Sequence, residues 1–326
     1  MDKEKASGIL VFAEERKGDV HNVAYELLNK AQELKEDLDC EVASAVLSSQ
    51  KLDYSELIYR GADKVYCIED KKFASPEENY YKKNLLKITN AFNPEILLLG
   101  ATGFGRSLAP RLAIALETGL TADCVDLQID EESNKLIQIR PAFSGNILAH
   151  IKTEGLPQMA TIRYKEFTEA PRDTSRSGEI IKLEPTEGEI EVGIEKIEER
   201  AKDITEAEII IAGGQGLKQP QDLDILQDLA DKLGGMVGAS RDIVDEGYIS
   251  HAHQVGYSGA RVKPKIYIAC GISGATQHIV GMKEADIIIA INKDPSAPIF
   301  NVADYGIVGD LYEVVPDLIA KIEDCM

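Results

Sequence analysis

The chain has 326 residues, of which 44% are hydrophobic and 28% are charged, a globular composition with enough length for about two domains. A formal net charge of -20 repels phosphate backbones and anionic membrane surfaces, and therefore argues against nucleic-acid binding. No run approaches the roughly eighteen continuous apolar residues of a membrane-spanning helix, so we expect no membrane span.

The N-terminus and the cysteines indicate a reduced, cytoplasmic protein. The first residues, MDKEKASGILVFAEE, pass from charged side chains into a short apolar run without the pattern of a signal peptide. The five cysteines lie far apart and form no CxxC pair, so neither a zinc site nor an iron–sulfur motif is expected.

The first part of the chain alternates between strand and helix patterns, which predicts βαβ units and a parallel sheet. The predicted strands are 9–12, 42–47, 64–68 and 96–99, and the predicted helices include 20–35 and 77–91. Four more strand patterns follow without long helices between them, which favours antiparallel pairing. They cover residues 125–129, 136–140, 147–151 and 158–163. We therefore predict a mixed α/β N-terminal domain with a largely parallel sheet over residues 1–185.

Residues 170–208 differ in composition, with few large apolar side chains and many glutamates. A solvated connector is the simplest interpretation, with one strand at 190–194. We place this acidic connector at 186–206, and a second domain at 207–326.

The second domain again alternates strands and helices, and glycines cluster at its strand ends. We predict strands at 208–212, 236–238, 266–270 and 287–292, and helices at 221–233, from Thr276 onward and at 316–323. Glycine at the end of a parallel strand lets the backbone approach a ligand closely. This pattern predicts a second α/β domain whose strand ends converge on one edge.

The stretch LGATGFGRS (99–107) follows a predicted strand and imitates a phosphate-binding loop. Arg106 stands where the phosphate-binding lysine belongs, and its wide guanidinium is no equivalent of that point charge. A structural helix start or subunit contact is favoured over a nucleotide site.

A second glycine-rich turn, AGGQGLKQPQD (212–222), fails the GxGxxG dinucleotide pattern because Gln219 occupies the third glycine position. This turn is informative because similar residues recur at three strand ends. The strand ends at 213–216, 238–241 and 271–274 carry glycine together with serine or arginine. Such ends meet at one edge of a parallel sheet.

Two further stretches have a structural and a functional interpretation each. In GASR (238–241), Ser240 is either a helix N-cap or a ligand contact, and Arg241 is either a surface cation or a ligand contact. In HAHQVGYSGARVKP (251–264), His251 and His253 lack a third metal ligand and read as solvated loop residues. The amides and hydroxyls of that loop suit hydrogen bonding to a heterocycle or a polyol chain.

The stretch IACGISGATQH (268–278) reads as a strand, a glycine-rich turn and a helix start. The free backbone N–H groups and the helix dipole can hold an anion there without a lysine. His278 is either a buried core histidine or a donor to the oxygen of a bound ring.

These motifs together resemble the FAD-binding domain of the α subunit of electron transfer flavoprotein, the FixB family. The resemblance rests on GGQGLK, GASR, HQVGYSG, YIACGISGATQHIVGM and INKDPSAPIFNVADYGIVGDLYEVVPDL, and runs from about residue 213 to 318. In the N-terminal half it rests on GATGFGRSLAPRLA, TGLTADC and RPAFSGN.

The resemblance implies a Rossmann-like FAD-binding domain in a heterodimer with a smaller electron transfer flavoprotein β subunit. One FAD belongs to this chain, and a second FAD or an AMP belongs to the β subunit. Such a complex carries electrons between flavoprotein dehydrogenases, such as acyl-CoA dehydrogenase, and other redox partners. Some members of the family bifurcate electrons from NADH to ferredoxin and a dehydrogenase. The α subunit has no independent catalytic centre.

The resemblance also implies the residues that contact FAD. Arg241 would lie against the isoalloxazine with Ser240 beside it, Ser258 near flavin N5, and His278 at the O2/N1 edge. Asn292, Asp310 and Leu311 would hold the adenosine half. Gln215, Tyr257 and Ser258 depart from the arginine, glutamine and threonine that many members carry. The full predicted set is Gln215, Ser240, Arg241, Gln254, Val255, Gly256, Tyr257, Ser258, Ser273, Gly274, Ala275, Thr276, Gln277, His278, Asn292, Asp310 and Leu311.

Two alternatives of other classes stay open. An adenine-nucleotide-binding α/β enzyme would use GATGFGRS to hold phosphates, although hydrolysis of a nucleoside triphosphate needs the missing lysine. A non-redox scaffold subunit would bind no chromophore.

Overall fold

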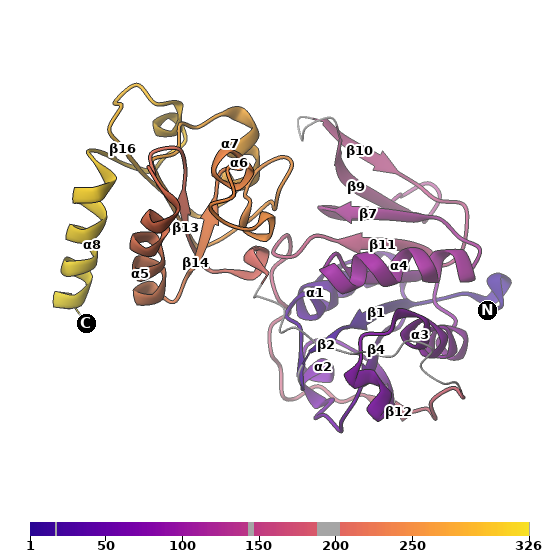
Figure 1. Cartoon of the computed structure of the whole chain (residues 1–326). Helices are drawn as coiled ribbons and strands as arrows, with labels where there is room; N and C mark the ends of the chain where they lie inside the picture. The colour runs from indigo at the N-terminus through magenta and orange to yellow at the C-terminus, as the bar shows by residue number, and fades with distance from the viewer. Residues whose placement is uncertain (17, 143–146, 188–202, 326) are drawn as a thin grey trace. The chain divides into compact units, whose positions relative to one another are not determined.

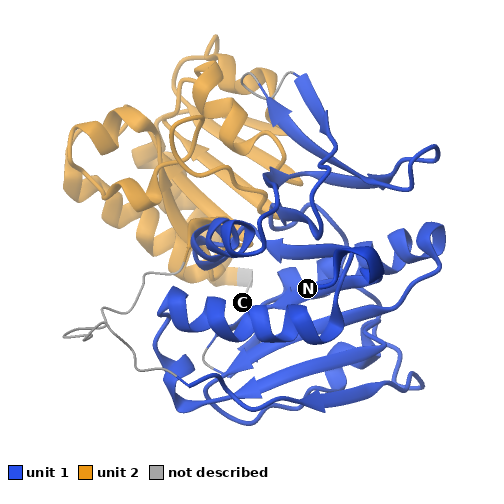
Figure 2. Ribbon diagram, turned by 90° about the vertical axis from the view of Figure 1, so that its right-hand side faces the viewer, with its two compact units in different colours: residues 1–197 blue, residues 198–326 orange. Residues whose placement is uncertain are grey.

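The computed structural model describes residues 1–16, 18–142, 147–187 and 203–325. The chain divides into two compact units, residues 1–197 (unit 1) and residues 198–326 (unit 2), coloured separately in Figure 2. Most of the predicted acidic connector at 186–206, including its strand at 190–194, lies outside the described residues. The predicted domain boundaries therefore stay predictions.

Unit 1 is built on a seven-stranded sheet in the order β12-β5-β4-β1-β6-β11-β7, and all of its paired strands run parallel (Figure 1). The central strands read as continuous apolar runs because both faces of the sheet are covered. The strands are β1 (Ile9–Ala13), β4 (Val42–Ser48), β5 (Lys64–Glu69), β6 (Ile96–Gly100), β7 (Leu120–Cys124), β11 (Gln158–Ile162) and β12 (Glu179–Lys182).

Helices cover both faces of this sheet, and the alternation along β1 shows how. Ile9 and Val11 belong to the core beneath α1 and α2, whereas Leu10 and Phe12 belong to the core beneath α3 and α4. The helices are α1 (Val23–Leu38), α2 (Ser55–Tyr59), α3 (Glu78–Phe92) and α4 (Gly103–Ala115), with short 3-10 turns at Lys3–Lys5 and Lys71–Ala74. The prediction of a largely parallel α/β domain is confirmed.

The antiparallel pairing predicted after residue 125 is confirmed for three strands and wrong for the fourth. Strands β8 (Asp126–Ile129), β9 (Leu136–Ala142) and β10 (Ile147–Ile151) form a small antiparallel sheet. Strand β11 instead enters the main sheet, parallel to β6 and β7. Its five residues are all buried, as expected of an interior parallel strand. A two-stranded ribbon of β2 (Glu15–Arg16) and β3 (Asp19–Val20) completes the unit.

The stretch from residue 170 is not wholly a solvated connector. Residues Glu179–Lys182 form β12, which pairs with β5 at the edge of the main sheet. Sequence patterning could not show this, because three of the four side chains are exposed and alternation is lost.

Unit 2 carries a five-stranded parallel sheet in the order β14-β13-β15-β16-β17. Because the chain runs from β13 to β14 on one side and returns to β15 on the other, the strand order reverses beside β13, where open α/β sheets bind ligands. The strands are β13 (Ile209–Gly213), β14 (Met236–Ala239), β15 (Ile266–Cys270), β16 (Ile287–Asn292) and β17 (Tyr305–Val308).

Helices α5 (Leu223–Leu233), α6 (Arg241–Asp245) and α8 (Leu311–Cys325) share one core of unit 2. Helix α7 (Thr276–Met282) packs into the core of the other face. Short 3-10 turns lie at Ile204–Glu206, Pro220–Asp222, His251–His253 and Pro298–Asn301. The predicted Rossmann-like parallel domain is confirmed, although β17 and the first turn of α8 were not predicted.

One buried carboxyl group ties a loop of unit 1 to its core. Glu26 on α1 is 3% exposed, and its carboxyl oxygens accept the backbone N–H of Lys165 at 3.1 and 2.9 Å. Burial raises the pKa of Glu26 to about 7, although hydrogen bonds from the backbone of Lys165 and Phe167 oppose this rise.

This raised pKa predicts a pH-dependent stability of unit 1. The folded state binds more protons than the unfolded state between the usual carboxyl range and pH 7, so the free energy of unfolding falls as pH rises through that interval. Between pH 5 and pH 8 we expect the wild type to lose up to about 3 kcal/mol more stability than Glu26→Gln. Pulse proteolysis in urea at both pH values measures the difference. Glu36→Gln, on the exposed side of the same helix, is the control and should retain the wild-type pH dependence.

Candidate functional site

A cavity of about 500 Å³ lies over the carboxyl ends of the strands of unit 2. Its walls are the turn after β13, the starts of α6 and α8, the loop before β15, and the turns after β15 and β16. This is the edge on which the glycine-rich strand ends are predicted to converge.

Most of the predicted site residues line this cavity. The exceptions are Gly274 and Thr276. Gly274 has φ +88°, and a Cβ there would lie 2.2 Å from the backbone nitrogen of Ile299. Glycine at this position therefore allows the turn after β15 to approach the backbone of Ile299 closely. Thr276 is the first residue of α7. The residues that line the cavity are Gln215, Ser240, Arg241, Gln254, Val255, Gly256, Tyr257, Ser258, Ser273, Ala275, Gln277, His278, Asn292, Asp310 and Leu311.

The turns after β13 and β15 pack directly against each other at the floor of the cavity. Gly216 donates its N–H to the carbonyl of Gly271 at 3.0 Å. A Cβ on Gly216 would lie 2.6 Å from the Cα of Gly271, and Gly271 itself has φ +64°. Only glycine allows this approach without a shift of the backbone.

His278 is a neutral side chain in the wall of the cavity. It is 6% exposed, and burial lowers its pKa to about 4. A weaker interaction with the backbone of Val255 raises the pKa but does not offset burial. Its Nε2 lies 2.9 Å from the hydroxyl of Tyr267. Its Nδ1 is buried and makes no hydrogen bond of ordinary geometry to any residue that the structure describes. Because the ring is uncharged, it offers a hydrogen bond rather than a positive charge.

Ser240 and Arg241 each have a structural and a ligand-binding interpretation, and the structure agrees with the structural one only in part. Ser240 occupies the N-cap position of α6, yet its side chain makes no capping bond, and its Oγ is buried with no hydrogen-bond partner among the described residues. Arg241 has a 68% exposed side chain, and its Nε lies 3.0 Å from Oδ2 of Asp245. The hydroxyl of Ser240 therefore remains available to a ligand, and Arg241 lies on the rim of the cavity.

The loop before β15 is held by its own polar contacts. Gln254 is 2% exposed and donates its side-chain amide to Oγ of Ser258 at 3.0 Å. Gly256 has φ +145°, and its next residue, Tyr257, donates its backbone N–H to the carbonyl of Gln277 at 2.7 Å. Tyr257 is 53% exposed. The loop thus attaches to α7 and presents Ser258 to the cavity.

A cluster at the α8 end of the cavity was missed from the sequence. Asp222 accepts the backbone N–H groups of Lys218 at 2.9 Å and Gln219 at 3.2 Å, and the hydroxyl of Tyr312 also donates to it. These hydrogen bonds outweigh burial and lower the pKa of Asp222, whereas burial and this carboxylate raise the pKa of Tyr312 to about 12. The ammonium of Lys218 lies 4.5 Å from the centre of the Tyr312 ring. Nothing local in the sequence marks this long-range cluster.

In unit 1, the stretch that imitates a phosphate-binding loop (99–107) makes hydrogen bonds and close contacts within the unit. Thr102 caps α4 by accepting the N–H of Gly105 at 2.9 Å and donates to Glu14 at 2.5 Å. A Cβ on Gly105 would lie 2.0 Å from the carbonyl oxygen of Gly100. Gly105 therefore serves helix packing, which supports the structural interpretation.

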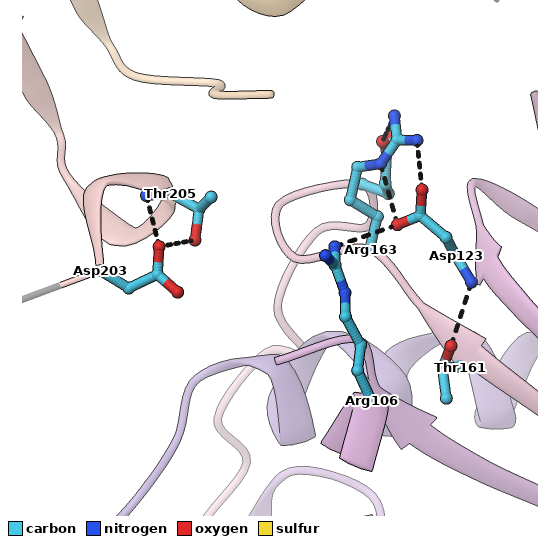
Figure 3. A network of polar contacts seen from close by, with 7 residues as sticks. Arg106, Asp123, Thr161, Arg163, Asp203 and Thr205 are labelled. Atoms are coloured by element: carbon cyan, nitrogen blue, oxygen red, sulfur yellow. Dashed lines mark hydrogen bonds and ion pairs between the residues drawn. The ribbon is translucent and has the colours of Figure 1, made fainter. Parts of the chain in front are cut away.

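Arg106, which replaces the phosphate-binding lysine, belongs to a network with Asp123 and Arg163 (Figure 3). It lies 3.4 Å from Asp123, and Arg163 binds the same carboxylate at 2.8 Å. Among the described residues, no three side chains of His, Cys, Asp and Glu gather to hold a metal ion. Within those residues, too, no helix is long and apolar enough to cross a membrane.

Comparison with known proteins identifies the family. Residues 9–188 match the electron transfer flavoprotein domain, and residues 203–283 match the electron transfer flavoprotein FAD-binding domain. The chain is 46% identical to the electron transfer flavoprotein subunit alpha of Thermoanaerobacterium thermosaccharolyticum, over 97% of both chains. It belongs to the electron transfer flavoprotein α-subunit family.

Two other members of this family have informative names. The electron transfer flavoprotein subunit alpha of Clostridium acetobutylicum is 42% identical, over 99% of both chains. Lactate dehydrogenase (NAD(+),ferredoxin) subunit LctC of Acetobacterium woodii is 41% identical, over 99% of this chain and 78% of that protein. The match to the FAD-binding domain spans the cavity residues from Gln215 to His278.

The Asp222 cluster predicts a specific loss of stability in unit 2. Asp222→Asn removes the charged acceptor of two backbone N–H groups and should cost about 2 kcal/mol near pH 7. Because the pKa of Asp222 is lowered, the wild type should lose this advantage as pH falls through the usual carboxyl range, and the variant should not. Amide hydrogen exchange of β13 and α5 measures the effect. Asp224→Asn, exposed in the first turn of α5, should leave exchange unchanged.

Proposed function

We propose that this chain binds one FAD in the cavity of unit 2 and serves as the α subunit of a heterodimeric electron carrier. The bound cofactor would supply reversible electron transfer, and the chain would set its orientation, its exposure and its reduction potential. The observation that carries the proposal is the gathering, in one cavity, of nearly all the residues predicted for FAD from family resemblance.

The residues present fit a polar dinucleotide. Oγ of Ser240 and Nδ1 of His278 are buried without ordinary hydrogen-bond partners, which is costly unless a ligand pairs with them. Gly216 and Gly271 keep the turns free of side chains, so a ligand can reach the backbone at the floor of the cavity. The cavity volume is in the range of cofactor sites, and FAD would extend beyond it along the strand ends.

The flavin end of the site would lie between Arg241, Ser258 and His278. Arg241 would stabilise negative charge gained on reduction, and Asp245 would attenuate this effect because it pairs with the same guanidinium. Ser258, oriented by Gln254, would offer its hydroxyl near N5. His278 would act as a neutral donor to the carbonyl edge.

The adenosine end would lie against the turn after β16 and the start of α8. The side chain of Asn292 donates to the carbonyl of Ile272 at 2.9 Å, and therefore shapes the wall. Asp310 accepts the backbone N–H of Tyr312 at 3.0 Å and caps α8. Lys218 and Lys293 line the same cavity and would supply positive charge in a site where Gln215 replaces the family's frequent arginine.

The partners proposed here rest on the family. A β subunit would complete the heterodimer and hold a second FAD or an AMP, and a flavoprotein dehydrogenase such as acyl-CoA dehydrogenase would exchange electrons with it. Likeness to a subunit named lactate dehydrogenase (NAD(+),ferredoxin) favours a complex that also uses NADH and ferredoxin. A cytoplasmic location stays a prediction from the N-terminus and cysteine usage.

Co-expression with the candidate β subunit tests the proposal. We expect a yellow heterodimer with flavin absorbance, and extraction should yield one FAD from this chain plus one FAD or AMP from its partner. A second FAD together with NADH-dependent reduction of ferredoxin would support bifurcation. A colourless complex that turns over ATP would favour the adenine-nucleotide enzyme, and a colourless inert one would favour the scaffold subunit.

The position of Arg241 predicts its effect on the flavin. Arg241→Gln should lower the midpoint potential by about 60 mV, since losing one nearby cation destabilises the reduced form by roughly a factor of ten for one electron. Arg261→Gln makes the same charge change at a residue whose guanidinium lies 5.9 Å from the Tyr257 ring, outside the cavity lining. Its potential should stay close to that of the wild type. Equal shifts in both variants would refute a specific role for Arg241.

A further inference from the structure

Tyr267 lies directly behind the cavity wall and is not among the residues predicted for the site. It stands on β15 and is fully buried, with an exposed fraction of 0%. Its hydroxyl lies 2.9 Å from Nε2 of His278, and the two rings are tilted by 59°. Among the described residues this hydroxyl has no other hydrogen-bond partner.

The direction of this hydrogen bond follows from counting protons. Burial raises the pKa of Tyr267 well above its usual value and lowers that of His278, so a neutral phenol faces a neutral imidazole. If Nε2 carried the imidazole proton, it would donate to the phenol and leave the phenol proton buried without an acceptor. If the phenol donates to Nε2, its proton is satisfied and the imidazole proton resides on Nδ1.

The surroundings of Nδ1 favour the second arrangement. The backbone of Val255 acts on His278 in the direction expected of an acceptor for a ring N–H. Val255 and His278 both line the cavity. We therefore infer that the carbonyl of a ligand bound there could accept the Nδ1–H in place of the backbone.

We propose that Tyr267 is a positioning residue that holds His278 in the Nδ1–H tautomer and thereby presents a neutral N–H donor to the cofactor. The tautomer is a property of this chain alone, whereas delivery of the donor to a flavin carbonyl rests on the proposed function. Burial keeps this donor uncharged near pH 7.

Nitrogen NMR tests the tautomer directly. The full-length chain, in the assembly in which it purifies, is labelled with ¹⁵N-histidine and measured with FAD bound and after FAD removal. Comparison with His278→Asn assigns the resonances among the five histidines. We expect a protonated Nδ1 and an unprotonated Nε2 in both states. A protonated Nε2, or an imidazolium near pH 7, overturns the proposal.

Tyr267→Phe removes the phenol hydroxyl and keeps the ring. We expect His278 to populate both tautomers and FAD to bind about three- to tenfold more weakly, since one buried hydrogen bond is lost. Tyr305→Phe, at a tyrosine of β17 that is 64% exposed, is the matched control and should change neither quantity. If Tyr267→Phe keeps both the Nδ1–H tautomer and the affinity, Tyr267 does not position His278.

The two measurements separate this inference from the proposed function. Tight FAD binding with a protonated Nε2 would sustain the function and refute the role of Tyr267. A protonated Nδ1 in a chain that binds no FAD, even with its β subunit, would sustain the tautomer and refute the function.

Discussion

The site in unit 2 depends on the contact between two glycine turns at the reversal of strand order. Gly216 and Gly271 approach so closely that a methyl group on either would meet the backbone of the other. Because these turns leave β13 and β15, the strands on the two sides of the reversal, their contact sets the floor of the cavity.

The charge around this cavity differs from that of the whole chain. The formal net charge is -20, whereas the cavity lining holds three basic residues, Lys218, Arg241 and Lys293, and three acidic ones, Asp242, Asp294 and Asp310. The charges of the lining therefore balance, although acidic residues outnumber basic ones in the whole chain. His278 adds no charge, since it is buried and neutral. The positive field at the flavin end would therefore come from Arg241, and hydrogen bonds would supply the rest.

Much of this architecture could be predicted, and the errors have physical causes. Interior strands such as β15 and β16 are short runs rich in isoleucine, and their predicted bounds agree with the structure to the residue. Strand β17 was missed because all four of its residues are exposed. The last helix is predicted at 316–323, but it begins at Leu311 and contains Pro316 in its interior. The parallel placement of β11 depends on pairing with β6 and β7, which lie far from it in sequence, and periodicity cannot reveal such pairing.

The site residues were predicted from resemblance rather than from local pattern. Lone motifs such as GASR left two interpretations open, and only the cavity brings their residues together. Tyr267 and Tyr312 escaped prediction because each makes its side-chain hydrogen bond to a residue of another element, His278 and Asp222 respectively, which the local sequence pattern does not show.

The position of β11 has a consequence for synthesis on the ribosome. Among the strands that the structure describes, β7 (Leu120–Cys124) pairs in the main sheet only with β11, and β11 is complete only at residue 162. A nascent chain that has emerged as far as β10 therefore exposes β7 and the flank of β6 without a neighbour. A product truncated at that stage would therefore expose unpaired strand edges, and such edges favour aggregation.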